Sequence, residues 1–119
     1  MHFNVNHMKI VTETITIDEI KEMAAKLFGD MVKAVVDVEK DVLAVDAELH
    51  SDLEALLLDN GSKQKSLWGI NIYPDKTRET WLEFNSLINI KPAFGNRSMD
   101  IENIGVKEKI KKIIDKIVI

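Results

Sequence analysis

Two valine-rich runs, separated by three charged residues, restrict the fold of this 119-residue chain more than any other feature. They lie within Met31–Leu49, on either side of Glu39-Lys40-Asp41. Valine is β-branched and favours extended backbone, so a short charged break between two such runs predicts a tight β-hairpin. Period-two alternation predicts that the second strand runs through Leu49. Its core-facing side chains are expected to be Leu43, Val45, Ala47 and Leu49.

Capping signals predict two helices, one before and one after the hairpin. Thr16-Ile17-Asp18-Glu19 is a capping box, in which the Thr16 hydroxyl can accept a hydrogen bond from the Glu19 amide. Apolar residues at helical spacing follow as far as Gly29, which can adopt the left-handed conformation that ends a helix. Ser51-Asp52-Leu53-Glu54 is a second capping box, so Ser51 is expected to cap a helix over Asp52–Leu58 with almost no loop before it.

Four further segments complete the predicted order of elements. Met8–Thr14, Leu67–Tyr73 and Trp81–Ile90 each have the period of two that is typical of strands. Residues 106–119 place isoleucines on one stripe and lysines on the opposite side, as an amphipathic helix does. The order β-α-β-β-α-β-β-α predicts an α+β fold, with a mostly antiparallel sheet of about five strands and three helices on one face. Its first six elements match the split βαβ order of a ferredoxin-like fold.

The composition fits one ordinary domain at residues 8–119, with residues 1–7 expected as a flexible N-terminal extension. Apolar residues make up 45% of the chain, which is enough for a core. The chain has no cysteine, which excludes disulfides, thiolate metal sites and a cysteine nucleophile. No apolar run is as long as a membrane span, and the N-terminus lacks the pattern of a secretory signal. The sequence therefore predicts a cytoplasmic protein with no membrane contact.

The net charge of −4 is divided unevenly along the chain. Residues 1–60 hold 5 Lys against 13 acidic residues, whereas residues 61–119 hold 11 Lys and Arg against 7 acidic residues. Nucleic acid is a disfavoured partner for an acidic protein, because binding to phosphates depends on clustered positive charge. A nucleic-acid-binding or toxin-like role for the basic half is therefore the lesser hypothesis. It requires one face to carry Lys63, Lys65, Lys91 and Arg97.

Three polar side chains at alternate positions form the first candidate site. Asp46, Glu48 and His50 would converge on one face of a strand, where they are expected to be partly exposed. Carboxylates beside an imidazole suit a divalent cation or acid–base chemistry. The spacing matches no established metal motif, so no metal ligand and no other cofactor is assigned. The alternative is that these residues only solvate the junction between a strand and a capped helix.

Two further sets of polar residues complete the candidate ligand-binding residues. In Ala93–Asp100, Gly95 and Asn96 allow a sharp turn, and Arg97 and Ser98 could then donate to a carboxylate or phosphate. The alternative is an ordinary surface loop in which Arg97 bridges to an acidic neighbour. The second set would line one sheet face with amides and a phenol, which could bind a polar ligand or simply contact water. It consists of Asn71, Tyr73, Asn85 and Asn89.

A resemblance to a known family is carried by two long runs, VVDVEKDVLAVDAELHSDLEALLLDNGSKQKSLWGINIYPD and INIKPAFGNRSMDI. They resemble the family known as domain of unknown function 5674, over nearly the whole chain from Met8. The most specific pieces are DAELHSDLEALL, GSKQ, LWGINIYP and GNRS. The resemblance implies that residues 1–7 are an addition to the domain. Because the family has no assigned function, the resemblance implies no catalytic residues.

Two main functional hypotheses remain open. The first is a non-catalytic binding or interaction domain that forms a homodimer, because no recognised catalytic set is present and open sheet edges need a cover. A small polar or anionic ligand is a further candidate partner. The second is a small metal-dependent or acid–base hydrolase, in which Arg97 would hold an anionic substrate near Asp46, Glu48 and His50. The sequence leaves open whether the protein is an enzyme.

Overall fold

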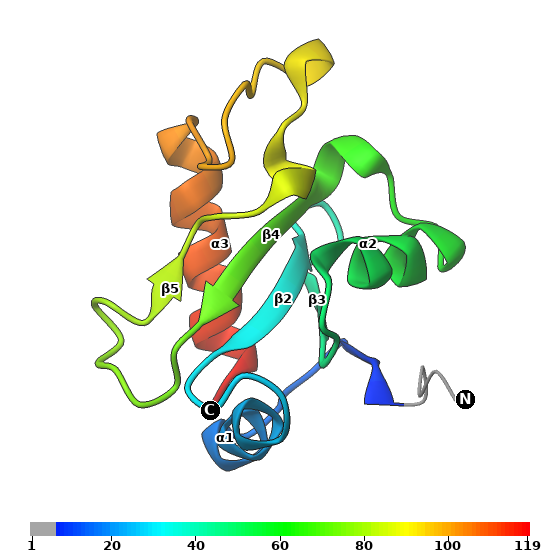
Figure 1. Ribbon diagram of the computed structural model, residues 1–119. Helices are drawn as coiled ribbons and strands as arrows, with labels where there is room; N and C mark the ends of the chain where they lie inside the picture. Colours follow the sequence, from blue (N-terminus) through cyan, green and yellow to red (C-terminus); the bar gives the residue numbers. More distant parts are fainter. Residues whose placement is uncertain (1–6) are drawn as a thin grey trace.

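A computed structural model describes residues 7–119 as a five-stranded sheet with helices on both faces (Figure 1). The strands are β1 (Lys9–Val11), β2 (Val32–Asp37), β3 (Val42–Val45), β4 (Leu67–Ile72) and β5 (Leu82–Glu83). They lie in the order β1-β3-β2-β4-β5, and each neighbouring pair is antiparallel. The helices are α1 (Ile17–Lys26), α2 (His50–Asp59) and α3 (Ile104–Ile117). The predicted α+β class and element order are confirmed, while the expected extension, apart from His7, lies outside the described residues.

The two faces of the sheet bury two separate groups of apolar side chains. α1 and α3 cover one face, where Ile20, Ile110 and Ile114 lie in the larger core. α2 covers part of the opposite face, where Leu53 and Leu57 lie in a smaller core. The expectation that all three helices share one face is therefore wrong.

The position of β4 explains why α2 lies on the opposite face. Successive antiparallel pairings make β1 parallel to β2, with β3 between them, and β3 parallel to β4, with β2 between them. The connections β1-α1-β2 and β3-α2-β4 are therefore crossovers between parallel strands. Both move across the sheet in the same direction, but they start from strands that run in opposite directions. Because such crossovers are almost always right-handed, their helices must lie on opposite faces. In a ferredoxin-like sheet β4 would pair with β1 instead, so that expected topology is wrong beyond the first split βαβ unit.

The terminal signals of α1 and the stripe of α3 behave as predicted. The Thr16 hydroxyl accepts a hydrogen bond from the Glu19 amide at 3.1 Å. Gly29 has a left-handed φ of +89°, and its amide donates to the Ala24 carbonyl at 2.6 Å. α3 buries its apolar stripe, which consists of Ile110, Ile113, Ile114 and Ile117. None of the helices in residues 7–119 has the length and apolar character needed to cross a membrane.

The junction between β3 and α2 differs from the prediction. β3 ends at Val45, and Asp46 then adopts a left-handed φ of +77°, a conformation that Asp tolerates better than most residues. α2 begins at His50, so Ser51 lies inside its first turn, and the N-cap residue Leu49 has no side chain that can accept a hydrogen bond. Leu49 is 54% exposed rather than buried. Of the predicted core positions, the structure buries Leu43, Val45 and Ala47.

The predicted strands at Met8–Thr14 and Trp81–Ile90 shrink to three and two residues. After Glu83 the chain leaves the sheet and forms an irregular segment, residues 84–103, before it enters α3 (Figure 1). Within it, the Ser86 hydroxyl accepts a hydrogen bond from the Ile88 amide at 3.3 Å and begins a short 3-10 turn. Side-chain bonding to nearby backbone thus replaces the ladder that the alternating pattern predicted.

Candidate functional site

The structure separates the three residues that were predicted to share a strand face. Asp46 lies half-buried at the left-handed bend, and Glu48 is exposed. His50 is only 8% exposed, in the first turn of α2, so its expected partial exposure is wrong. Among residues 7–119, no three His, Asp or Glu side chains lie close enough together to hold a metal ion.

His50 links α2 to β4. Its Nε2 lies 2.8 Å from the Ile70 carbonyl oxygen, and because a carbonyl only accepts, Nε2 must carry the proton. Burial is the main cause that lowers the pKa of His50, ahead of the Ile70 hydrogen bond, which raises it. The charge of Lys33 also lowers this pKa, and the Asn71 side chain raises it. A neutral imidazole with its N–H already bonded is a connecting residue rather than an exposed base.

Asn71 on β4 and Tyr73, the residue after its end, share a carboxylate on the neighbouring strand. Asn71 Nδ2 donates to Glu83 Oε1 at 2.7 Å, and the Tyr73 hydroxyl donates to the same oxygen at 3.3 Å. Burial, followed by the charge of Glu83, raises the pKa of Tyr73. Glu83 is not among the residues predicted from the sequence, although the register places it directly opposite Asn71. These bonds join β4 to β5 at the point where the sheet ends.

Asn89 takes the place of a missing strand beside β4. Its Oδ1 accepts from the Gly69 amide at 2.8 Å, and its Nδ2 donates to the Gly69 carbonyl at 2.9 Å. Asn89 therefore satisfies both backbone groups of a residue that β5 does not reach. The close packing also requires glycine, because a Cβ at position 69 would lie 2.5 Å from the Ser86 Cβ. Asn89 is fully buried and acts in the fold, not as an exposed ligand-binding residue.

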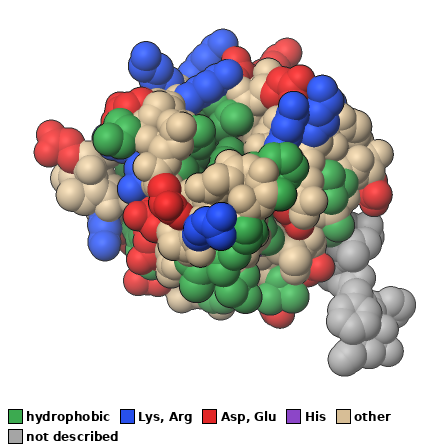
Figure 2. All heavy atoms as spheres, turned by 90° about the horizontal axis from the view of Figure 1, so that it is seen from above, with side chains coloured by type: hydrophobic (Ala, Val, Ile, Leu, Met, Phe, Trp, Pro, Cys, Tyr) green, Lys and Arg blue, Asp and Glu red, His purple; other side chains and the backbone are tan. Residues whose placement is uncertain are grey.

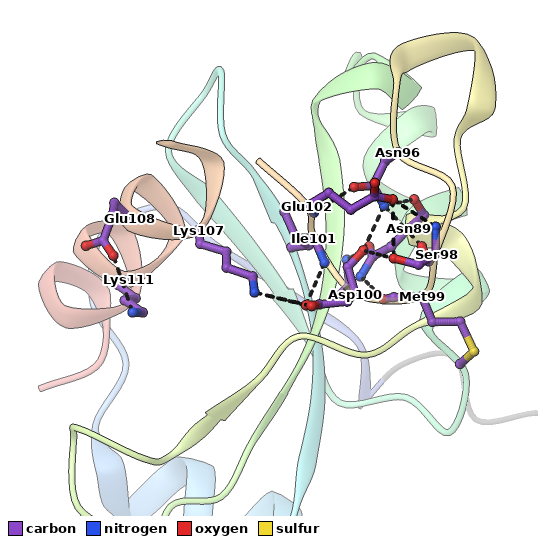
Figure 3. Close-up of polar contacts among 11 residues, drawn as sticks. Asn89, Asn96, Ser98, Met99, Asp100, Ile101, Glu102, Lys107, Glu108 and Lys111 are labelled. Atoms are coloured by element: carbon purple, nitrogen blue, oxygen red, sulfur yellow. Dashed lines mark hydrogen bonds and ion pairs between the residues drawn. The ribbon is translucent and has the colours of Figure 1, made fainter. Parts of the chain in front are cut away.

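Asn96 ties the far end of the irregular segment together (Figure 3). Its Nδ2 donates to the carbonyls of Asn89 and Asp100, each at 2.7 Å. Its Oδ1 accepts from the Glu102 amide at 2.8 Å. The side chain is 3% exposed, so its polar atoms are committed to backbone groups of the chain itself.

The anion predicted beside Arg97 and Ser98 is a carboxylate of the chain itself. Glu102 Oε2 accepts from the Arg97 amide at 2.6 Å and from the Ser98 amide at 3.1 Å (Figure 3). The Arg97 amide bond is the main cause that lowers the pKa of Glu102. The binding of an external carboxylate or phosphate at this turn stays a prediction. The contact with Glu102 resembles the alternative of a surface loop beside an acidic neighbour, except that backbone amides rather than the guanidinium make these bonds.

Lys91 is buried, contrary to its expected place on a basic face with Lys63, Lys65 and Arg97. Its Nζ donates to the Ile88 carbonyl at 3.0 Å and lies 4.0 Å from the Glu54 carboxylate. The ammonium also sits 5.3 Å from the centre of the Trp68 ring. Burial lowers the pKa of Lys91, while the charge of Glu54 raises it. The lysine therefore cannot contribute to an exposed nucleic-acid surface.

The outer edge of β1 is open. Within residues 7–119, β1 pairs only with β3, and a hollow of about 470 Å³ runs beside its other edge. Every residue in 9–15 lines this hollow, together with Glu19. Within the described part of the chain, the backbone groups of residues 12–14 make no hydrogen bond. Unpaired donors and acceptors of this kind are available to a further chain.

A second hollow, of about 570 Å³, adjoins the first and shares residues 12–14 with it. Its opposite wall is α3, and the chain on either side of residues 12–14 is fixed. Val11 pairs with Leu43 in the sheet, and the Ile15 amide donates to the Ile117 carbonyl at 2.8 Å. Local sequence patterns do not predict this site, because its two walls lie about a hundred residues apart in the chain.

A family model described as "Protein of unknown function (DUF5674)" matches residues 9–117. The chain belongs to this family. The match begins at the first residue of β1 and ends at the last residue of α3, so the DUF5674 region includes the whole sheet and all three helices. No curated protein and no solved structure is significantly similar to the chain. The predicted family is therefore confirmed, and its description assigns no function.

Proposed function

We propose that this DUF5674 protein is a non-catalytic interaction domain that binds a second copy of itself along the outer edge of β1. The observation that carries the proposal is the hollow beside that edge, next to backbone groups that have no partner among the described residues. An extended segment of another chain can add a strand to such an edge through main-chain hydrogen bonds. Pairing of this kind needs no catalytic residues, and it would satisfy the unpaired groups on both copies at once.

The charges along this edge favour a second copy as the partner. Lys9 lies at the beginning of the hollow, whereas Glu13 and Glu19 lie toward its other end. Antiparallel pairing of two identical edges places the basic end of each beside the acidic end of the other, and a two-fold axis creates this contact twice. Because β1 has only three residues, the interface is small and its affinity is expected in the micromolar range, about 10–100 µM.

Sedimentation equilibrium of a charge-swap series tests the proposal. Wild-type protein should form dimers as its concentration rises, and Lys9→Glu or Glu13→Lys should each weaken the dimer by about tenfold, since either change puts like charges together. The double variant Lys9→Glu/Glu13→Lys restores opposite charges and should recover most of the affinity. The matched control reverses Glu22 and Lys26, two exposed residues of α1, and should change nothing. A wild-type monomer at about 500 µM, or a double variant no tighter than the single ones, contradicts the proposal.

The hydrolase hypothesis has less support, because the strand face on which it was based does not form. Asp46, Glu48 and His50 lie in a loop, a bend and a helix, and the imidazole N–H of His50 is bonded to Ile70. The nucleic-acid hypothesis lacks one of its four cations, Lys91. Both remain hypotheses, as does the cytoplasmic location predicted from the sequence.

A further inference from the structure

We propose that the hollow between residues 12–14 and α3 is a binding site for a small organic anion, a carboxylate or phosphate that carries an apolar group. All of its lining residues come from one chain, so the proposal does not rest on self-association. The volume of about 570 Å³ lies in the usual range of small-molecule sites.

Three lysines of α3 supply the positive charge of the site. Lys109, Lys112 and Lys116 follow i, i+3, i+7 spacing, so they lie along one face of the helix, and all three line the hollow. Lys109 lies 3.9 Å from Asp41. No described acidic group lies within 4.0 Å of the other two ammonium groups.

The hollow keeps a positive balance although two acidic residues also line it. Glu13 and Asp41 contribute two negative charges against the three lysines. Asp41 is already paired with Lys109, so the cations without a partner are those on the next turns of α3. Lysine binds phosphate and carboxylate groups as a mobile point charge, which suits an anionic head group of either kind.

The residues that line the floor and the wall opposite α3 favour a ligand with an apolar group attached to its anionic head group. Ile113 and Ile117 line the hollow and are only 5% and 2% exposed, so they provide an apolar floor. The hydroxyls of Thr12 and Thr14 and the unpaired amides of residues 12–14 provide neutral donors opposite the lysines. A fully polar anion would leave the floor without a contact, whereas an apolar group next to the charge would cover it.

The walls of the site are held in place before any ligand arrives. The β1–β3 ladder fixes the chain before residue 12, and two backbone bonds fix it after residue 14. The Ile15 amide donates to the Ile117 carbonyl at 2.8 Å, and the Ile119 amide donates to the Ile15 carbonyl at 2.9 Å. Because the lining backbone is already ordered, binding costs little conformational entropy beyond that of the lysine side chains.

Titration of ¹⁵N-labelled full-length protein with four probes tests the proposal by NMR. Octyl phosphate and octanoate should shift the amides of residues 12–14 and 109–117, with dissociation constants of about 0.1–1 mM. Inorganic phosphate and octanol each lack one half of the ligand and should bind at least about tenfold more weakly. The stronger of the two octyl anions identifies the preferred head group. Raising the salt concentration should weaken the binding of both octyl phosphate and octanoate, since the lysines are exposed.

Paired substitutions assign the binding to the lysine rim. Lys112→Gln/Lys116→Gln should weaken the affinity for octyl phosphate by about tenfold. The control Lys26→Gln/Lys111→Gln removes the same number of charges outside the hollow and should change the affinity by less than about twofold. Equal losses in the two double variants, equal binding of octanol, or shifts that map outside the hollow would overturn the proposal. The same titration on Lys9→Glu separates it from self-association, because the anion should still bind when the dimer is weakened.

Discussion

The irregular segment 84–103 and the short stretch 12–14 both lie outside the regular sheet, but they differ in whether their backbone polar groups have hydrogen-bond partners. In the longer segment, the buried Asn89 and Asn96 side chains and the exposed Glu102 carboxylate bond to backbone groups. In the shorter one, no described group bonds to the backbone. The difference teaches that irregular backbone alone does not mark a binding site. A site is better indicated where polar groups lack partners, because buried ones are nearly always satisfied.

The contrast extends to the apolar side chains of the longer segment. Figure 2 views the end of the molecule where this segment lies and shows hydrophobic side chains at the surface among charged ones. Four of the ten exposed large hydrophobic residues in the described part of the chain belong to this segment, namely Leu87, Ile90, Phe94 and Met99. Since much of its apolar surface is exposed, the segment depends on its internal hydrogen bonds more than on apolar burial. Removing one of those bonds should therefore cost more than any change at residues 12–14.

The largest expected effect is that of Asn89→Ala. This change leaves both backbone groups of Gly69 without the Asn89 side chain and removes one of two donors to the Met99 carbonyl, which keeps the Ser86 amide. It should destabilise the protein by about 3 kcal/mol in urea unfolding. Asn85→Ala is the matched control, because the Asn85 side chain is exposed and makes no such bonds, and it should cost less than about 0.5 kcal/mol. A loss below about 1 kcal/mol for Asn89→Ala would mean that the segment is not held from inside.

An effect of intermediate size is expected at His50. Its imidazole has a hydrogen-bond partner, as the buried polar groups of the longer segment do, but it can also gain a proton as the pH falls. Because burial lowers its pKa in the folded protein, the folded state binds fewer protons than the unfolded state below the unfolded value of 6.5. Stability is therefore full above that pH and falls as the pH drops through 6.5 toward the lower folded pKa. His50→Gln should cost about 1 kcal/mol at pH 7.5 and flatten this dependence between pH 7 and pH 5. Urea unfolding between pH 7 and pH 5 measures this pH dependence, and His7→Gln, at an exposed histidine, is the control. If His50→Gln leaves the slope of stability against pH unchanged, the pH dependence does not come from His50.

The smallest effect is expected at the open edge. Thr14→Ala removes an exposed hydroxyl that has no described partner, so the stability should change by less than about 0.5 kcal/mol. Thermal unfolding at low protein concentration measures this, and the melting temperature should move by no more than about 3 °C. A loss above about 1 kcal/mol would show that residues 12–14 already have partners in the monomer, and it would remove the contrast between the two segments.

The parts of the fold that local signals determine could be predicted from the sequence. The capping box at Thr16, the charged turn of the hairpin and the isoleucine stripe of α3 each act within a few residues, and each appears where predicted. The junction after Val45 failed because a left-handed Asp46 interrupted an alternation that looked continuous. The position of β4 could not be read from local patterns, since it depends on which edge of the hairpin a later strand joins.

The candidate residues failed or succeeded for similar reasons. Asn89 and Asn96 looked like exposed amides because their partners cannot be read from local spacing; Gly69, for example, lies 20 residues from Asn89. The GNRS turn was proposed as an anion site because Arg97 and Ser98 follow a sharp turn, whereas the bonds observed there run from backbone amides to Glu102 of the same chain. One signal could have indicated the hollow at α3, namely three lysines at i, i+3, i+7 on a helix whose neighbouring face is apolar.

Backbone hydrogen exchange at two protein concentrations tests the central claim most directly. In dilute protein, the amides of residues 12–14 should exchange fast, while those of Arg97, Ser98 and Gly69 should be protected by their side-chain acceptors. At about 500 µM, new protection should appear within residues 9–14 and nowhere in residues 84–103. Equal protection of the two segments in dilute protein would contradict the account. So would protection that appears with concentration in the longer segment instead of at β1.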